Sequence, residues 1–115
     1  MIRRVTDRST FSRFRHGRHA RCGPLHVRYV DPDPAAPDHV RVAYAIGRRT
    51  GGAVVRNRAR RRLRAVMTEL DAAGRVPAGA YLISLSGPLA PLTHLELIAQ
   101  VTTAVERLAA SPVAR

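Results

Sequence analysis

A glycine-rich turn that runs straight into a strongly basic helix constrains this chain more than any other part of its sequence. Residues 47–64 read GRRTGGAVVRNRARRRLR. At about 100° per residue, the apolar side chains after the turn fall within about 40° of one line along a helix. This stripe consists of Val55, Ala59, Leu63, Val66 and Leu70. We therefore expect a helix from residue 52 or 53 to residue 70 or 71 that packs its stripe on a sheet.

The opposite side of this helix is positively charged, with no acid to balance it. Like charges three or four residues apart repel by about a few tenths of a kcal/mol per pair, and an ordinary solvated face would mix glutamate with arginine. No acidic residue occurs from residue 47 to residue 68. The polar residues of the turn and the helix that we predict to bind a polyanion are Arg48, Arg49, Arg56, Asn57, Arg58, Arg60, Arg61, Arg62 and Arg64.

The charge of the whole chain narrows the choice of polyanion. The net charge of +12 and the isoelectric point of about 11.7 are typical of proteins that bind nucleic acid or an anionic membrane. Residues 1–64 carry 17 arginines and 4 aspartates, whereas residues 65–115 carry 3 arginines and 4 acids. The apolar stripe of the basic helix is narrow, and the core needs it, so we favour nucleic acid and expect no membrane partner.

The remaining sequence predicts one α+β domain over residues 1–115. Alternating apolar residues predict strands over residues 25–29 and 40–46, and a mostly apolar run predicts another over residues 80–86. A weaker signal marks residues 18–21. The sheet is therefore expected to have four strands.

Two further helices are expected at the ends of the domain. The first covers residues 10–16, is capped by Asp7 or Ser9, and ends at Gly17. The last begins after Thr93. Its apolar residues at helical spacing are Leu95, Ile98, Val101, Thr102, Val105 and Leu108.

Two segments are predicted to lack regular structure. Residues 31–39, DPDPAAPDH, contain three prolines that cannot donate to a sheet, which indicates a surface loop. Residues 1–6 are polar and basic and are expected to form a mobile arm. The elements then follow one another as α-β-β-β-α-β-α, in a sandwich of helices on one sheet.

No catalytic or metal-binding pattern stands out in the sequence. The five histidines and the acids lack the spacing of a metal site, and Cys22 has no second cysteine with which to form a disulfide. The turn at residues 47–52 lacks the lysine and the spacing of a nucleotide-binding P-loop. No apolar segment suggests a membrane span or a secretion signal. We therefore expect a cytoplasmic, monomeric binding protein with no metal site of its own.

Residues 43–64, AYAIGRRTGGAVVRNRARRRLR, closely resemble the signature of the bacterial ribonuclease P protein subunit. In that signature a strand leads through a basic pair and a glycine into A-V-x-R-N-R and further basic residues. The matching residues are Arg48 and Arg49 for the basic pair, Gly51 for the glycine, and Arg56, Asn57 and Arg58 for the R-N-R core. The chain length, the order of the elements and the strand that bears Tyr29 are also similar to this family.

The resemblance implies that the protein assists the maturation of tRNA without being the catalyst. In ribonuclease P an RNA cuts the 5′ leader from precursor tRNA, with Mg²⁺ held mainly by RNA and substrate. The protein would bind the catalytic RNA through its arginine helix and hold the single-stranded leader in a cleft between the N-terminal helix and the sheet. The aromatic residues implied for the leader are Phe11, Phe14 and Tyr29, and core packing is the alternative for all three.

The resemblance also implies one unusual connection and leaves one rival function. The crossover from strand 40–46 through the basic helix to strand 80–86 would be left-handed, although such crossovers are right-handed in about 98% of cases. The rival is a structural RNA-binding protein of the ribosomal type, which would share the charge, the size and the lack of catalytic residues. The signature in residues 47–64 favours the ribonuclease P subunit.

Overall fold

The structure, a computed structural model, describes residues 2–110. Its strands and helices are β1 (Ile2–Arg4), α1 (Arg8–Phe14), β2 (Arg18–Cys22), β3 (Leu25–Val30), β4 (Val40–Ala45), α2 (Ala53–Ala72), β5 (Gly79–Leu85) and α3 (His94–Ala110). A short 3₁₀ turn, η1 (Arg48–Thr50), precedes α2.

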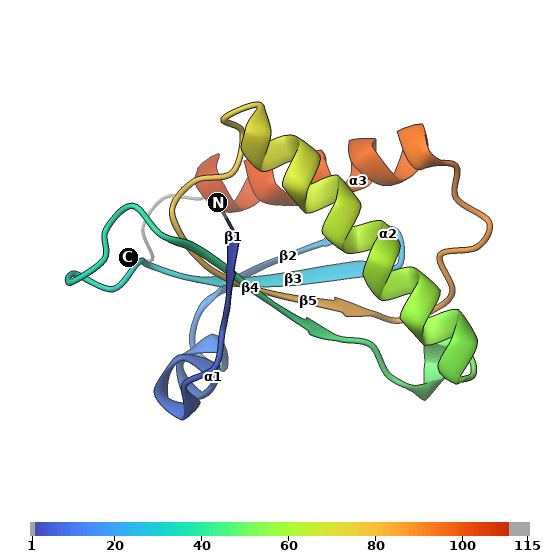
Figure 1. The fold of residues 1–115 in the computed structure, drawn as a ribbon, viewed down its shortest axis with the longest axis horizontal. Helices are drawn as coiled ribbons and strands as arrows, with labels where there is room; N and C mark the ends of the chain where they lie inside the picture. Colours follow the sequence, from blue (N-terminus) through green and yellow to red (C-terminus); the bar gives the residue numbers. More distant parts are fainter. Residues whose placement is uncertain (1, 111–115) are drawn as a thin grey trace.

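The strands form one sheet in the order β1-β4-β5-β3-β2. β1 pairs parallel with β4 and β4 parallel with β5, whereas β3 is antiparallel to β5 and β2 is antiparallel to β3. α2 and α3 lie on one face of this sheet, and α1 lies on the other (Figure 1). The parallel pairing of β4 with β5 is the pairing that the predicted crossover requires. Its left-handed sense stays a prediction.

The prediction of four strands was wrong, because the described residues form five. β1 lies within residues 1–6, which were predicted to be a mobile arm; instead Ile2 pairs with Val40 and Arg4 with Val42. Pairing of backbone groups with the free edge of β4 does not depend on apolar side chains, and charged side chains are common on edge strands. Two consecutive arginines therefore did not prevent a strand.

The other strand predictions agree with the structure. The weakly marked segment at residues 18–21 is β2. Residues 31–39 contain no helix or strand and are mostly exposed, in keeping with their prolines.

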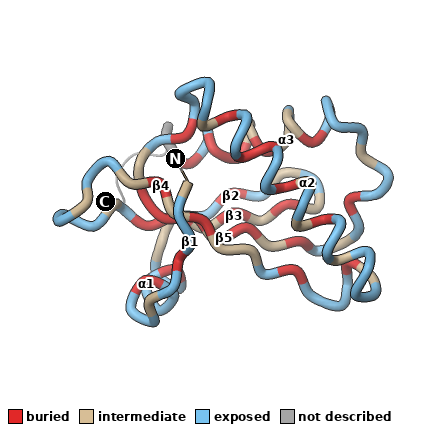
Figure 2. Tube along the Cα trace, viewed as in Figure 1, coloured by how far each residue is buried: buried red, intermediate tan, exposed pale blue. Residues whose placement is uncertain are grey.

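The main core lies between the sheet and the helices α2 and α3. Alternate residues of the strands point into it, for example Leu25 and Val27 of β3, and they are buried, as the red segments of Figure 2 show. On α3 the predicted stripe needs one correction, because Leu95 is 77% exposed while Leu97 is fully buried. Leu95 precedes Val101 by six residues, which turns it about 120° away from the buried side. Within residues 2–110, no helix has the length and apolarity that crossing a membrane requires.

A second, smaller core fixes α1 to the opposite face of the sheet. Phe14 packs there with Val5, Val30 and Ala80. Asp7 is the N-cap of α1, and its carboxylate accepts from the backbone N–H of Thr10 at 2.9 Å. The guanidinium of Arg41 on β4 donates to the same carboxylate at 2.9 Å. The start of α1 is therefore tied to β4, and its end is tied to the small core.

Candidate nucleic-acid interface

The turn into α2 depends on glycine. Gly51 has a φ of +144°, and a Cβ atom there would lie only 2.8 Å from Val55 Cγ1, so a side chain would be strained and would clash. Gly52 is the N-cap of α2 and offers no side chain to the first turn. The open N–H groups of that turn add to the positive potential of this end of the helix.

The apolar stripe of α2 is buried over most of its predicted length. Ala59, Leu63, Val66 and Leu70 are all in the main core, as predicted, and Met67 joins them. Val55 is the exception: it packs against the turn at Gly51 and stays 40% exposed.

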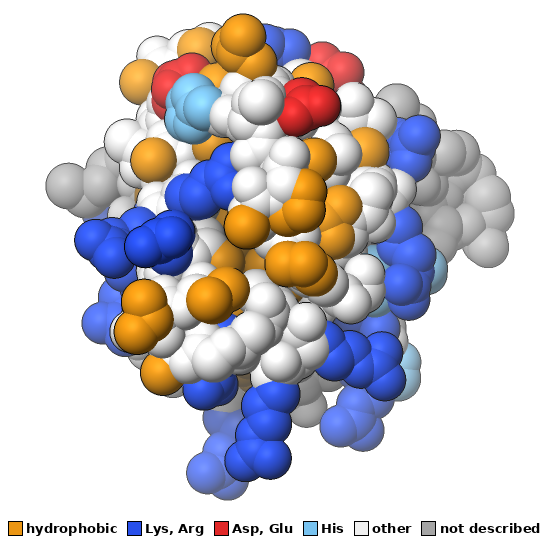
Figure 3. Space-filling model, turned by 90° about the vertical axis from the view of Figure 1, so that its right-hand side faces the viewer, with side chains coloured by type: hydrophobic (Ala, Val, Ile, Leu, Met, Phe, Trp, Pro, Cys, Tyr) orange, Lys and Arg blue, Asp and Glu red, His pale blue; other side chains and the backbone are white. Residues whose placement is uncertain are grey.

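Most of the predicted polar face of α2 is open to solvent. Its exposed members are Arg48, Arg49, Asn57, Arg58, Arg61 and Arg64. Arg60 is half-buried and donates to Asn57 Oδ1 at 2.9 Å. Arg56 is half-buried as well, and its buried Nε has no hydrogen-bond partner among the described residues. On the face drawn in Figure 3, most arginines lie at the sides and along the lower edge, and the acidic side chains lie near the top.

A cleft of about 470 Å³ lies between α1, the β1–β4 edge of the sheet and α2. Its lining residues are Arg4, Val5, Phe11, Val42, Ala43, Tyr44, Arg60 and Arg64. The guanidinium carbon of Arg64 lies 5.7 Å from the centre of the Tyr44 ring. Burial raises the pKa of Tyr44 to about 12, although the charge of Arg64 opposes the shift. The cleft therefore combines aromatic surface with fixed positive charge.

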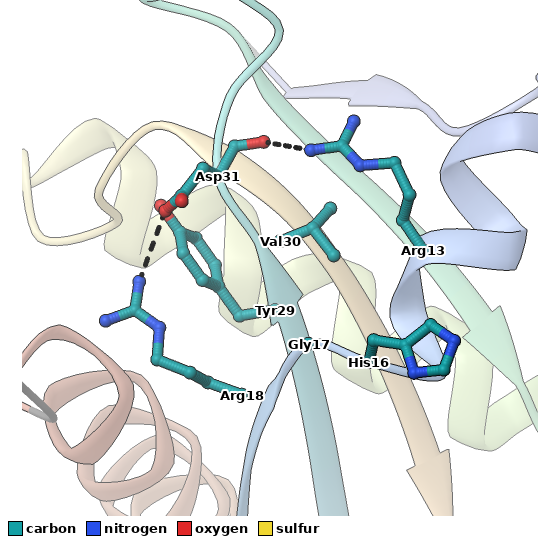
Figure 4. A pocket seen from close by; sticks show the side chains of 7 residues that line it. All are labelled: Arg13, His16, Gly17, Arg18, Tyr29, Val30 and Asp31. Carbon is teal, nitrogen blue, oxygen red and sulfur yellow. Dashed lines mark hydrogen bonds and ion pairs between the residues drawn. The ribbon is translucent and has the colours of Figure 1, made fainter. Parts of the chain in front are cut away.

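A second pocket, of about 300 Å³, lies where α1 meets β2 and β3 (Figure 4). Arg13 donates to the backbone carbonyl of Asp31 at 3.3 Å, and Arg18 donates to its carboxylate at 3.4 Å. The Arg18 guanidinium carbon also lies 4.8 Å from the centre of the Tyr29 ring. The cations of this pocket are thus partly neutralised by the protein itself.

Comparison with known proteins identifies the family. The sequence model of the family described as ribonuclease P matches residues 2–109. The chain belongs to the ribonuclease P protein family. It is 38% identical over 108 residues to the ribonuclease P protein component of Thermobifida fusca, an alignment that covers 90% of this chain and 72% of that protein. The corresponding protein of Streptomyces avermitilis is 33% identical over 89 residues, or 73% of this chain and 71% of the relative.

Solved structures of ribonuclease P proteins share the fold. The protein from Staphylococcus aureus matches with a TM-score of 0.72 at 19% identity, over 93% of this chain and 94% of that one. The protein from Thermotoga maritima matches with a TM-score of 0.74 at 17% identity, over 87% and 91%. This chain is thus a protein component of a tRNA-processing ribonuclease, and the ribonuclease P RNA is its partner.

In this ribonuclease P protein, the two phenylalanines implied for the leader have different surroundings. Phe14 is 1% exposed and lies in the small core, so its ring has almost no surface to offer a base. Core packing, the alternative, is what the structure shows for Phe14. Phe11 is 43% exposed and lines the cleft. The two rings contact edge to face, with centroids 6.1 Å apart.

Tyr29 also differs from the predicted stacking surface. Only 7% of the residue is exposed, and its hydroxyl donates to the Ala78 carbonyl at 2.6 Å. Burial raises the pKa of Tyr29, as does the nearby Asp31 carboxylate. Because Arg18 lies over its ring, Tyr29 serves the fold and supports Arg18 in the second pocket.

Arg62 belongs to the predicted RNA-binding residues, but in the structure its side chain makes hydrogen bonds within the protein. Its guanidinium donates to the carbonyls of Leu89 at 2.8 Å and Leu92 at 2.5 Å, and so ties α2 to the connection between β5 and α3. Arg62 lies on the flank of the arginine face, where this connection approaches α2. Its predicted contact with RNA stays a prediction.

Two residues of the cleft, Arg4 and Tyr44, were not among the predicted site residues. Arg4 lies within the predicted mobile arm, and Tyr44 lies within the predicted strand over residues 40–46. The alternation of β4 does place Tyr44 beside the core, but the free edge of β4 beyond β1 exposes part of it. Within residues 2–110, no group of three or more His, Cys, Asp or Glu side chains could hold a metal ion.

Proposed function

We propose that this protein binds the catalytic RNA of ribonuclease P with the outer side of α2 and holds the 5′ leader of precursor tRNA in the cleft. The observation that carries this proposal is the cleft itself, where Phe11 of α1 lies on the same cavity as Arg60 and Arg64 of α2. Arginine provides bidentate contacts to phosphate, and an exposed ring provides a stacking surface for an unpaired base.

The position of each arginine around α2 supports two surfaces. Arg60 and Arg64 line the cleft. Arg58 lies on the other side of the helix, beside Ala90 and the connection to α3. Residues 58 and 60 point about 160° apart around the helix. An RNA segment bound in the cleft would therefore leave the opposite side of α2 free to bind a second RNA. The residues proposed for the catalytic RNA are Arg48, Arg49, Asn57, Arg58 and Arg61.

In the cleft, Phe11 and Tyr44 would contact the bases of the leader, while Arg4, Arg60 and Arg64 would contact its phosphates. Arg64 already lies over the Tyr44 ring, so it can stack on a base and reach a phosphate from one position. Single-stranded RNA is recognised by such combinations of flat side chains and positive charge.

We assign the chemistry of cleavage to the RNA. Mg²⁺ prefers carboxylate and other oxygen ligands, but the charged residues that line the cleft are arginines. The protein residues present therefore do not fit Mg²⁺ there, and we place the ion with the RNA and the substrate. The protein would contribute binding and orientation, as a monomer in the cytoplasm.

The test is to add the purified protein to the catalytic RNA and precursor tRNA at low Mg²⁺ and to measure cleavage. We expect the protein to raise the rate and to lower the Mg²⁺ concentration that cleavage requires. A protein that binds RNA only as a structural component would leave both unchanged, and that result would overturn the proposal. Mature tRNA should compete poorly with precursor tRNA if the leader occupies the cleft.

A further inference from the structure

Two histidines contact each other on the face of the sheet opposite α2 and α3. His26 Nε2 of β3 lies 3.4 Å from His19 Nδ1 of β2, and the ring planes are perpendicular with centroids 5.3 Å apart. In the register of these strands, His26 is opposite Arg21 and His19 is opposite Arg28. Residues directly opposite in an antiparallel pair share a face. Two imidazoles and two guanidiniums therefore form one cluster.

No acid balances this cluster from the neighbouring strand. On β5, Ser84 lies opposite His26 and Leu82 lies opposite Arg28, and both are uncharged. α1 approaches through the Phe14 carbonyl, which accepts from Arg28 at 3.4 Å. Burial lowers the pKa of His26, and the charges of Arg21, Arg28 and His19 lower it further.

The contact between the rings favours a state with fewer protons. In a hydrogen bond between two imidazoles, one nitrogen donates and the other must be unprotonated. Protonation of both rings would place N–H groups on both nitrogens of the contact, beside two arginines. A phosphate group at this position would favour the protonated state of both rings, because its oxygens accept hydrogen bonds from both of them.

The register of the sheet connects the cluster to the cleft. Ala43 of β4 lines the cleft and is paired with Leu82 of β5. Leu82 is paired with Arg28 of β3, and Arg28 is paired with His19 of β2. These four residues form one row across four strands, and three spacings between strands span about 14 Å. A few nucleotides of single-stranded RNA that leave the cleft can cover this distance over Ala43 and Leu82, which are both only partly buried.

We propose that the His19–His26 pair is a proton-linked contact for the phosphates of single-stranded RNA on the open face of the sheet, so that RNA binding takes up protons. This inference rests on the proposed function, since it extends the path of the bound RNA from the cleft. A metal site is the less favoured use of the pair, because no group of three ligands includes it among the described residues. The outcome is RNA affinity that rises as the pH falls.

The test uses the full chain and a labelled uridine oligomer, because uridine has no group that titrates near neutral pH. We expect Kd to fall roughly three- to tenfold between about pH 7.5 and pH 5.5 at constant ionic strength, the upper value corresponding to net uptake of about half a proton averaged over this range. Calorimetry in two buffers of different ionisation enthalpy counts the protons directly. The double variant His19→Gln with His26→Gln should keep its affinity at the higher pH within about twofold and lose most of the pH dependence.

Two further variants make the result specific. His94→Gln removes a histidine that pairs with Glu69 on the helical side of the molecule, and it should keep the pH dependence of the wild type. His26→Arg carries a fixed charge and should bind tightly at both pH values. Thermal unfolding at each pH shows whether the variants are folded.

A flat pH profile in the wild type would overturn the inference, as would an unchanged profile in the double variant or no binding of the oligomer at either pH. A flat profile in the wild type or an unchanged profile in the double variant does not touch the proposed function, which is judged by the stimulation of cleavage by the catalytic RNA. If the protein did not stimulate cleavage but the Kd for the oligomer depended on pH, the histidine contact with RNA would be supported and the proposed role in ribonuclease P would not.

Discussion

The two helices that border the cleft each carry a pair of similar side chains with opposite roles. On α1, Phe14 is buried while Phe11, three residues earlier, is exposed to the cleft. On α2, the Arg62 side chain is bonded to two backbone carbonyls, whereas the side chain of its neighbour Arg61 is exposed and makes no hydrogen bond or ion pair within residues 2–110. Residue type therefore does not decide whether a side chain serves the fold or the interface. Its surroundings in the tertiary structure decide.

The largest expected effect is that of Phe14→Ala on stability. Removing a fully buried ring should lower the free energy of unfolding by about 3–5 kcal/mol, which is a large part of the stability of a small domain. Urea denaturation followed by circular dichroism measures it. Phe11→Ala is the matched control and should cost less than about 1 kcal/mol. Equal losses for the two variants would contradict the contrast drawn for α1.

Arg62→Ala should be the next largest effect, again on stability. The variant loses two hydrogen bonds from a charged group to carbonyls, and about 2–4 kcal/mol of unfolding free energy is expected to be lost. Arg61→Ala, one residue away, should change it by at most about 0.5 kcal/mol. If Arg62→Ala instead weakened RNA binding with no change in stability, Arg62 would belong to the interface after all.

Phe11→Ala tests the cleft by affinity. Loss of one stacked ring should weaken binding of precursor tRNA by about 1–3 kcal/mol, or roughly five- to a hundredfold. Affinity for mature tRNA and for the catalytic RNA should be nearly unchanged, because neither carries a leader. Measuring Kd of the holoenzyme for both tRNAs separates the outcomes, and parallel losses would argue against a leader in the cleft.

The double variant Arg58→Ala with Arg61→Ala should change the salt dependence of binding to the catalytic RNA. Each lost phosphate contact lowers the slope of log affinity against log salt concentration by about 0.7–0.9, so a decrease of up to about 1.8 is expected with the fold intact. Arg75→Ala is the control, because Arg75 pairs with Glu106 at 3.1 Å, away from α2's arginine face. An unchanged slope in the double variant would remove this side of α2 from the interface.

The smallest effect concerns Asp7, the N-cap of α1. Hydrogen bonds from Thr10 and Ser9 hold the pKa of this carboxyl well below its usual range. A depressed carboxyl pKa means stability that is present above about pH 4 and lost as the pH falls further. Asp7→Asn should therefore lower Tm at neutral pH and flatten the fall of Tm with acid. Asp38→Asn, in the exposed loop, should do neither.

The sequence was sufficient to predict those features that depend on residues close together along the chain. The bounds of α2 agree with the prediction within two residues, because its apolar stripe and the glycines before it act within a few residues. Gly51 is required by its own φ and by Val55 four residues later. The alternating strands β3 and β4 and the proline-rich loop between them follow from the same short-range rules.

The leader site could not be predicted in the same way. A helical period places Phe11 and Phe14 about 60° apart around α1, but it does not say which of them faces the sheet. That choice is made by Val5, Val30 and Ala80, which come from three separate strands or their ends. The cleft likewise joins Arg4, Phe11 and Tyr44 to Arg64, so its existence depends on contacts between distant segments.

The sequence by itself determined the family signature, the charge, the basic helix and most of the strands, since each is written in residues that are neighbours along the chain. Only the tertiary structure decided that residues 2–4 form an edge strand, that Arg62 bonds to carbonyls 27 and 30 residues away, and that two histidines meet across β2 and β3. The physical reason is that periodicity fixes the direction of a side chain on its own element. The groups that it meets there are supplied by other parts of the chain.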